Sequence, residues 1–147
     1  MDFGDSRDAR AYVELLGDYA RDPMGGGQAL PEQVLRRLPR DLAAHPGAHG
    51  LLAESDGRAV GFATCFVGYS TFLAQPLLNV HDIAVLPAWR RRSVARQLLE
   101  AIAELGRRLD CCRITLEVRE DNAVARGLYR DVGFRPAPCS LFMEKPL

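Results

Sequence analysis

Two stretches in the second half of the chain contain residue types that could do chemistry, and the first predicts an anion site. An apolar segment, Asp82 to Leu86, runs through Pro87 into a helix that opens with small and cationic residues. The first turn of a helix has unpaired N–H groups and a partial positive charge, and small residues let an anion approach them. The stretch therefore predicts a pyrophosphate site, with a solvated helix start as the alternative. The residues concerned are Arg90, Arg91, Arg92, Ser93, Val94, Ala95 and Arg96.

The second stretch combines a carboxylate, an amide and a phenol. Glu117 lies within an expected strand, Asn122 opens the next helix, and Tyr129 follows about two turns later on the same helix face. A phenol beside a reacting group can donate a proton or stabilise a negative charge. Periodicity alone explains Asn122 as a helix cap and Tyr129 as a packed, half-buried aromatic residue, so both interpretations stay open at this point.

The composition is that of one globular domain. The chain has 147 residues, of which 48% are hydrophobic and 26% charged, which predicts a single domain over residues 1–147. Its 19 basic residues balance 19 acidic ones, so the overall charge does not attract nucleic acid or an anionic membrane. No apolar run approaches the length of a membrane span, and the segment Met1 to Asp5 lacks the features of a secretion signal. We therefore expect a cytoplasmic protein that binds neither nucleic acid nor membrane.

The four cysteines do not indicate a metal site. They form no C-x-x-C pair, and no histidine stands at zinc-ligand spacing from them. We expect free thiols with no part in the chemistry, and no bound metal. The cysteines are Cys65, Cys111, Cys112 and Cys139.

The elements that must position these residues follow from hydrophobic periodicity and from glycine and proline. Helices are expected over 7–20, 32–44 (with a break at Pro39), 91–109 and 122–132, the last with Gly133 just beyond its end. Strands are expected over 49–54, 59–67, 79–86 and 112–118, with terminal strand pieces at Phe134 and 141–144. Asp56-Gly57 predicts a tight hairpin turn. This order predicts an α/β (α+β) fold, with a mixed central sheet flanked by helices.

Together the two stretches resemble the GNAT superfamily of acyl-coenzyme A-dependent N-acetyltransferases. The family pattern V-x-P-x-x-R/Q-x-x-G-x-G/A matches Val85 to Ala95, except that Ser93 replaces the first glycine. A second family pattern, N-x-x-A-x-x-L-Y-x-x-x-G-F, matches Asn122 to Phe134 without departure. The resemblance covers roughly residues 49–147 and implies a GNAT-like, mostly antiparallel sheet. The first strand that is usual in this family is hard to see in Met1 to Ser6.

The resemblance implies roles for the matched residues. Backbone groups of Ile83 to Val85, with Ala84 between them, would hold the pantetheine arm of acetyl-coenzyme A as an added strand. The amides of residues 91–96, directly after Arg90, would hold the pyrophosphate. Asn122 would bond the pantetheine region, and Tyr129 would protonate the departing thiolate.

The general base is left open between two residues. Glu117 stands in Leu-Glu-Val-Arg, which resembles ribosomal-protein alanine acetyltransferases, where a glutamate there is the base. His81 and Asp82 occupy the place of a Glu-Asp pair in diamine acetyltransferases, and alternation along a strand predicts that only one of them faces the substrate. The alternatives are a packed histidine and a glutamate paired with an arginine. The segment Tyr69 to Leu73 also resembles the diamine enzymes and is expected either beside the acceptor or as a lid over the core. Gly25 to Gly27 is either an acceptor-site loop or a linker.

The sequence therefore predicts an N-acetyltransferase that moves an acetyl group from acetyl-coenzyme A to a primary amine by direct attack in a ternary complex. The acceptor is a small-molecule or a protein amine, and a homodimer stays open. The alternative is a catalytically silent acyl-coenzyme A-binding module. An arginine-driven nucleic-acid binder is disfavoured by the zero net charge.

Overall fold

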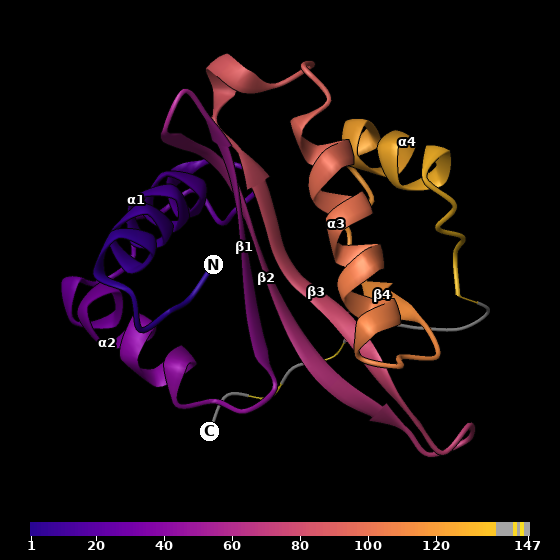
Figure 1. Ribbon diagram of the computed structural model, residues 1–147. Coiled ribbons are helices and arrows are strands. Elements are labelled where there is room, and N and C mark those ends of the chain that lie inside the picture. The colour runs from indigo at the N-terminus through magenta and orange to yellow at the C-terminus, as the bar shows by residue number, and fades with distance from the viewer. Residues whose placement is uncertain (138–142, 144, 146–147) are drawn as a thin grey trace.

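A computed structural model describes residues 1–137, 143 and 145 of the chain. Helices α1 and α2 cover one face of a four-stranded sheet, and α3 and α4 lie on the other face (Figure 1). The elements are α1 (Ser6–Arg21), α2 (Glu32–Ala43), β1 (Ala48–Ser55), β2 (Arg58–Ser70), β3 (Gln75–Val85), η1 (Pro87–Trp89), α3 (Val94–Arg108), β4 (Ile114–Leu116) and α4 (Ala123–Asp131).

The strand order is β1-β2-β3-β4, which confirms the predicted mixed, mostly antiparallel sheet. β1 with β2 and β2 with β3 pair antiparallel, whereas β3 and β4 pair in parallel. This last pairing covers only Leu78–Val80 against Ile114–Leu116. Because β3 continues to Val85, its second half has an open edge where β4 has already ended.

Local sequence explains where most of the elements begin and end. Asp5 caps α1 by accepting from the amides of Arg7 and Asp8, and the helix ends at Asp22, just before Pro23. Asp56 and Gly57 both have positive φ (51° and 75°), as a two-residue hairpin turn between β1 and β2 requires.

The predicted break at Pro39 is wrong, because α2 continues through it. Leu42 lies beyond Pro39 and is buried in the core, so packing compensates for the single backbone bond that proline removes.

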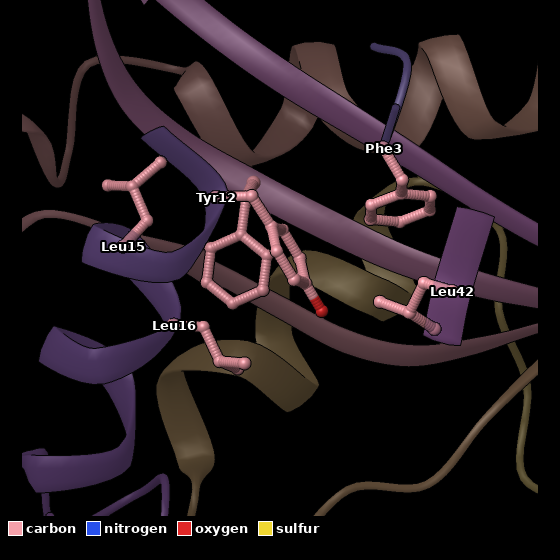
Figure 2. Packing of buried hydrophobic residues seen from close by; sticks show 6 residues of the cluster. Phe3, Tyr12, Leu15, Leu16 and Leu42 are labelled. Atoms are coloured by element: carbon pink, nitrogen blue, oxygen red, sulfur yellow. The ribbon is translucent and has the colours of Figure 1, made fainter. Parts of the chain in front are cut away.

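The core between the sheet and α1 is aromatic. Figure 2 shows Tyr12 of α1 with Leu15 and Leu16 on one side and Phe3 and Leu42 on the other. Tyr12 makes edge-to-face contacts with Phe3 (5.2 Å between ring centroids) and with Phe62 of β2 (5.5 Å). Its hydroxyl is paired with Thr64 Oγ1 at 2.9 Å, so this deeply buried polar group is satisfied.

The second core lies between the sheet and α3. Ala63, Cys65, Leu78 and Val80 of the sheet pack against Leu99 and Ile102. α4 joins this core through Leu128 and Tyr129, so the helix that carries the predicted phenol is held on the α3 side.

The amino-terminal residues run along the outer edge of β1. As the sequence suggested, they form no strand, yet Phe3 is buried and the Met1 amino group donates to Gly50 O at 3.3 Å. A Cβ on Gly50 would lie 2.7 Å from Met1 Sδ and from Phe3 Cζ. Only glycine lets the terminus approach β1 this closely.

Several predicted boundaries shift. The expected loop over 68–76 is largely strand, because β2 extends to Ser70 and β3 begins at Gln75. The expected strand over 112–118 is reduced to Ile114–Leu116, so Cys112 lies outside it. α3 begins three residues later than expected, after a turn over 90–93.

The terminal strand pieces are not observed where the chain is described. Phe134 lies outside any strand and packs edge-to-face on Tyr129, with ring centroids 5.8 Å apart. The expected strand over 141–144 falls outside the described residues, apart from Met143, which is not in a strand. Cys139 also falls outside them.

Candidate active site

The open edge of β3 presents unpaired backbone groups. Leu86 N donates to Val60 O at 2.9 Å, and Val85 is paired with Gly61 in the β2–β3 register. In an antiparallel ladder, backbone groups alternate between the two edges of a strand. Ala84 therefore bonds to β2, whereas the N–H and C=O groups of Ile83 and Val85 point towards the open edge. Of these four groups, the Val85 carbonyl is already paired, because it accepts from Arg90 Nε at 3.1 Å. The predicted pantetheine-binding positions thus have the backbone orientation that an added strand needs.

The start of α3 has an anion-binding backbone geometry. Arg91 (φ 64°) and Ser93 (φ 63°) both adopt the left-handed conformation within the turn that precedes the helix. Successive amides in such alternating conformations form a concave nest, and the first turn of the helix adds its own unpaired N–H groups. Ser93 makes no side-chain cap bond, so these amides stay available to a ligand. The left-handed conformation at Ser93 also explains why the family pattern has glycine there.

The arginines around this nest have different contacts. Arg92 stacks over Trp89 at 5.1 Å from the ring centroid, and Arg96 lies 3.6 Å from Asp131 of α4. Arg90 turns away from the nest, because its Nε donates to Val85 O at 3.1 Å and its Nη2 donates to Asp22 Oδ2 at 2.7 Å. The sequence suggested a cofactor contact for Arg90 and gave no signal of this long-range ion pair.

Asn122 and Tyr129 are placed by α4. Asn122 caps the helix, with its Oδ1 accepting from Ala125 N at 3.1 Å, which leaves its NH₂ group for a ligand. Burial is the main cause that raises the pKa of the Tyr129 phenol, and Tyr19 raises it further. A phenol with a raised pKa is neutral at physiological pH and therefore carries a proton that it can donate.

Tyr19 of α1 lies beside the candidate site, and the sequence did not single it out. It lines a cavity of about 390 Å³ together with Ala84, Val85 and Arg90. Burial, then the nearby Asp82 and Asp22 carboxylates, raise the pKa of its phenol. The helix expected over 7–20 contains Tyr19, but helical periodicity could not show that this residue lies beside the open edge of β3.

His81 and Asp82 share one face of the sheet, so the prediction that they face opposite ways is wrong. In the register, Thr64 pairs with Asp82 and Cys65 with Val80, which leaves His81 as the extra residue of a β-bulge. The bulge interrupts the alternation. His81 packs edge-to-face on Phe66, a residue of the α1-side core, with ring centroids 5.5 Å apart. Asp82 is bonded to Thr64 on the same side.

Asp82 is partly buried. Burial raises the pKa of its carboxyl, whereas the neighbouring His81 and the hydrogen bond from Thr64 act in the opposite direction. Thr64 in turn is bonded to Tyr12, so Asp82 ends a buried polar chain that links α1 to the bulge.

Glu117 directly follows β4 and contacts Asn79 of β3. Asn79 Nδ2 donates to its two carboxylate oxygens at 3.4 and 3.3 Å. Asn79 pairs with Phe66 in the register, which places Asn79, Glu117 and His81 on the α1 side of the sheet. In the described part of the chain this glutamate has Asn79 as its partner and no arginine, contrary to the alternative of an Arg–Glu pair.

The aromatic segment Tyr69 to Leu73 is not part of this site. It forms the hairpin tip between β2 and β3, at the opposite end of β3 from Val85 (Figure 1). Phe72 there is 97% exposed, so the tip is not a lid over the core either.

The remaining polar residues do not add a metal site. Among residues 1–137, 143 and 145, no three His, Cys, Asp or Glu side chains gather as metal ligands.

Cys65 is buried, which raises the pKa of its thiol to about 12. Within the same residues, no helix is long and apolar enough to cross a bilayer.

A mixed sheet that opens beside a helix N-terminus, with Tyr129 on one side and His81, Asp82 and Glu117 on the other, is the arrangement expected of a GNAT-type fold. The model of the acetyltransferase (GNAT) family matches residues 12–134, and the chain belongs to this family. This confirms the resemblance stated on the two sequence patterns, and it agrees with the predicted acetyl-coenzyme A-dependent acyltransferase class.

The chain is similar in sequence to several named acetyltransferases. The chain is 31% identical over 96 residues to a putative [ribosomal protein bS18]-alanine N-acetyltransferase of Bacillus subtilis, covering 65% of this chain and 60% of that protein. It is 39% identical over 98 residues to N-alpha-acetyltransferase RimI of Mycobacterium tuberculosis, covering 65% of this chain and 57% of that protein. These matches thus span less than two thirds of either relative.

The solved structures agree on the fold. A probable acetyltransferase superposes with a TM-score of 0.84 at 23% identity, covering 98% of this chain and 95% of that one. AAC(6')-Iy in complex with a bisubstrate analogue superposes with a TM-score of 0.78 at 21% identity, covering 97% and 94%.

Proposed function

We propose that this chain is an N-acetyltransferase that moves the acetyl group of acetyl-coenzyme A to a primary amine. The observation that carries the proposal is the open edge of β3 beside the amide nest at Arg91–Ser93, which together fit an extended arm ending in a pyrophosphate. Family membership supports the same conclusion.

The donor is held by backbone groups. Ile83 bonds the pantetheine arm through its N–H and C=O groups, whereas Val85 offers only its N–H, because its carbonyl accepts from Arg90. The amides of residues 91–96 bind the pyrophosphate without needing a particular side chain. The NH₂ group of Asn122 bonds the arm from the α4 side. These contacts place the thioester beside the Tyr129 phenol of α4.

The transfer is direct. The amine nitrogen attacks the thioester carbonyl carbon, so a C–N bond forms as the C–S bond breaks. The Val85 N–H stabilises the oxyanion, because it points to the open edge. A proton of the amine passes to a base, and Tyr129 gives its proton to the departing thiolate. No covalent enzyme intermediate forms, so the cysteines take no part.

The base is Glu117 or His81, which lie on the α1 side of the sheet. Glu117→Gln and His81→Gln distinguish the two, because only the variant that lacks the base should lose most of its kcat/KM. The other variant should keep a kcat/KM close to that of the wild type.

The acceptor class is a primary amine on a small molecule or a protein. The names of the relatives include a ribosomal protein alanine and an aminoglycoside amine as targets, which have this group in common. Analytical ultracentrifugation of the wild type measures whether two copies of the chain associate.

Release of free thiol with a panel of amines tests the proposal. We expect turnover by the wild type and a loss of about 100-fold in kcat for Tyr129→Phe, with the acetyl-coenzyme A Kd unchanged within twofold. Tyr19→Phe is the matched control, because it removes the other phenol near the open edge. A Ser93→Glu variant should lose donor binding, because its carboxylate would face the phosphates.

The alternative, a silent acyl-coenzyme A-binding module, predicts normal donor affinity and no thiol release with any amine. A larger effect of Tyr19→Phe than of Tyr129→Phe would contradict the assignment of the acid. Unchanged donor affinity in Ser93→Glu would contradict the location of the pyrophosphate.

A further inference from the structure

Arg90 joins two parts of the molecule that are far apart in sequence. It stands between η1 and α3, next to the amide nest, but its guanidinium contacts Val85 of β3 and Asp22 at the end of α1. The Asp22 side chain is only 19% exposed, so this ion pair is better shielded from solvent than the others that the described residues form.

Asp22 also organises the loop that follows it, residues 22–30, called here the α1–α2 loop. Its second carboxylate oxygen accepts from Met24 N at 2.9 Å, and its own carbonyl accepts from Gly25 N (2.8 Å) and Gly27 N (3.1 Å). The loop is then tied back to α1 by Gln28 N, which donates to Ala20 O at 3.0 Å.

The α1–α2 loop packs so closely on α1 that it has no room for a side chain at position 25. A Cβ on Gly25 would lie 2.0 Å from Tyr19 O. Tyr19, Asp22 and Arg90 all line the 390 Å³ cavity that adjoins Val85. Asp22, where the loop begins, therefore borders the Val85 end of β3 on the face where the candidate acid–base groups lie.

We propose that the Asp22–Arg90 ion pair is a positioning contact that holds the α1–α2 loop against the donor-binding end of β3 and so shapes the acceptor side of the site. The proposal rests on the proposed function, which identifies the donor side and the acceptor side of the site. It assigns Arg90 to the loop, and leaves the pyrophosphate to the backbone amides of residues 91–96. Asp22 and Arg90 touch no reacting atom and act through the loop.

Hydrogen exchange of the loop amides tests the contact without turnover. Asp22→Asn keeps an acceptor for Met24 N but removes the charge-assisted bond to Arg90. We expect the Gly25, Gly27 and Gln28 amides to exchange about 5-fold faster in Asp22→Asn and in Arg90→Gln than in the wild type. Asp18→Asn is the matched control, because it removes the Asp18–Arg21 ion pair (2.6 Å) one turn earlier and should leave these rates unchanged.

Steady-state kinetics separate positioning from a purely structural role. With the amine that gives the highest turnover in the panel, Asp22→Asn should raise the acceptor KM about 5-fold while kcat and the acetyl-coenzyme A KM stay within twofold. The Kd of coenzyme A, measured by calorimetry, should likewise stay within twofold in Asp22→Asn and Arg90→Gln.

Two results would overturn the inference. One is loop exchange in Asp22→Asn equal to that of the wild type. The other is a loss of 10-fold or more in coenzyme A affinity for Arg90→Gln with unchanged loop exchange, which would make Arg90 a phosphate ligand. A wild type that releases no thiol with any amine would instead refute the proposed function, and the exchange rates would still decide whether the ion pair holds the loop.

Discussion

Ser93 offers a sharp test, because its backbone is in a conformation that glycine adopts at no steric cost. At φ 63° a side chain with a Cβ loses roughly 1–2 kcal/mol relative to a right-handed residue. Glycine removes this strain but adds about 0.4–1 kcal/mol of conformational entropy to the unfolded chain. The net expectation for Ser93→Gly is a gain of about 0.5–1 kcal/mol in the free energy of unfolding.

For a chain of this length such a gain raises the Tm by about 1–4 °C, which differential scanning calorimetry can measure. Two variants control for the chemistry of the substitution. Ser93→Ala keeps the strain and removes only a hydroxyl that makes no cap bond, so it should leave the Tm unchanged. Gln97→Gly introduces glycine within α3 in right-handed conformation and should cost about 1 kcal/mol.

The change in Tm should therefore be positive for Ser93→Gly, near zero for Ser93→Ala and negative for Gln97→Gly. A Tm for Ser93→Gly at or below that of Ser93→Ala would refute the inference that the backbone of this turn is strained. Donor affinity is a second readout, because the geometry of the nest does not depend on the Ser93 hydroxyl. Affinity in Ser93→Gly should match or exceed that of the wild type.

Two further predictions concern the interior and the edge of the sheet. Burial raises the pKa of the Asp82 carboxyl, so the folded state disfavours its charged form. The free energy of unfolding of the wild type, relative to that of Asp82→Asn, should therefore be highest at or below the unfolded pKa of about 3.9. It should fall as the pH rises through the raised folded pKa. Urea unfolding of both proteins between pH 4 and 8 measures this, and a parallel pH dependence of the two would contradict it. Gly50→Ala should destabilise the fold by about 1–2 kcal/mol, because the new methyl group meets Met1 and Phe3. The urea midpoint checks this, with Gly127→Ala as a control that has open space and should not lose stability.

Periodicity and the positions of glycine, proline and capping residues were sufficient to predict the order of the elements. The spacing of apolar residues and the signals at Asp56-Gly57 and Pro87 depend only on neighbours along the chain, so the sequence alone carries them. The amide nest could also be expected in outline, because a helix start needs only local residues to bind an anion.

What the sequence could not predict depends on residues that are distant along the chain. The bulge at His81 is a property of the pairing with Cys65 and Thr64, and without that register strict alternation is the simplest expectation. The position of Tyr19 beside β3 depends on how α1 crosses the sheet. The Arg90–Asp22 contact joins residues 68 positions apart, and an arginine in a phosphate-binding pattern gives no signal of such a partner.

The brief pairing of β4 with β3 has a consequence for folding as well as for binding. α4 contributes no fully buried side chain, and the three-residue strand that precedes it is its main covalent tie to the sheet. Local opening should therefore begin at this corner, at a free energy well below that of global unfolding. A molecule that pairs with the open edge of β3 would act as a missing strand, and β4 and α4 would reach their full rigidity only while it is bound.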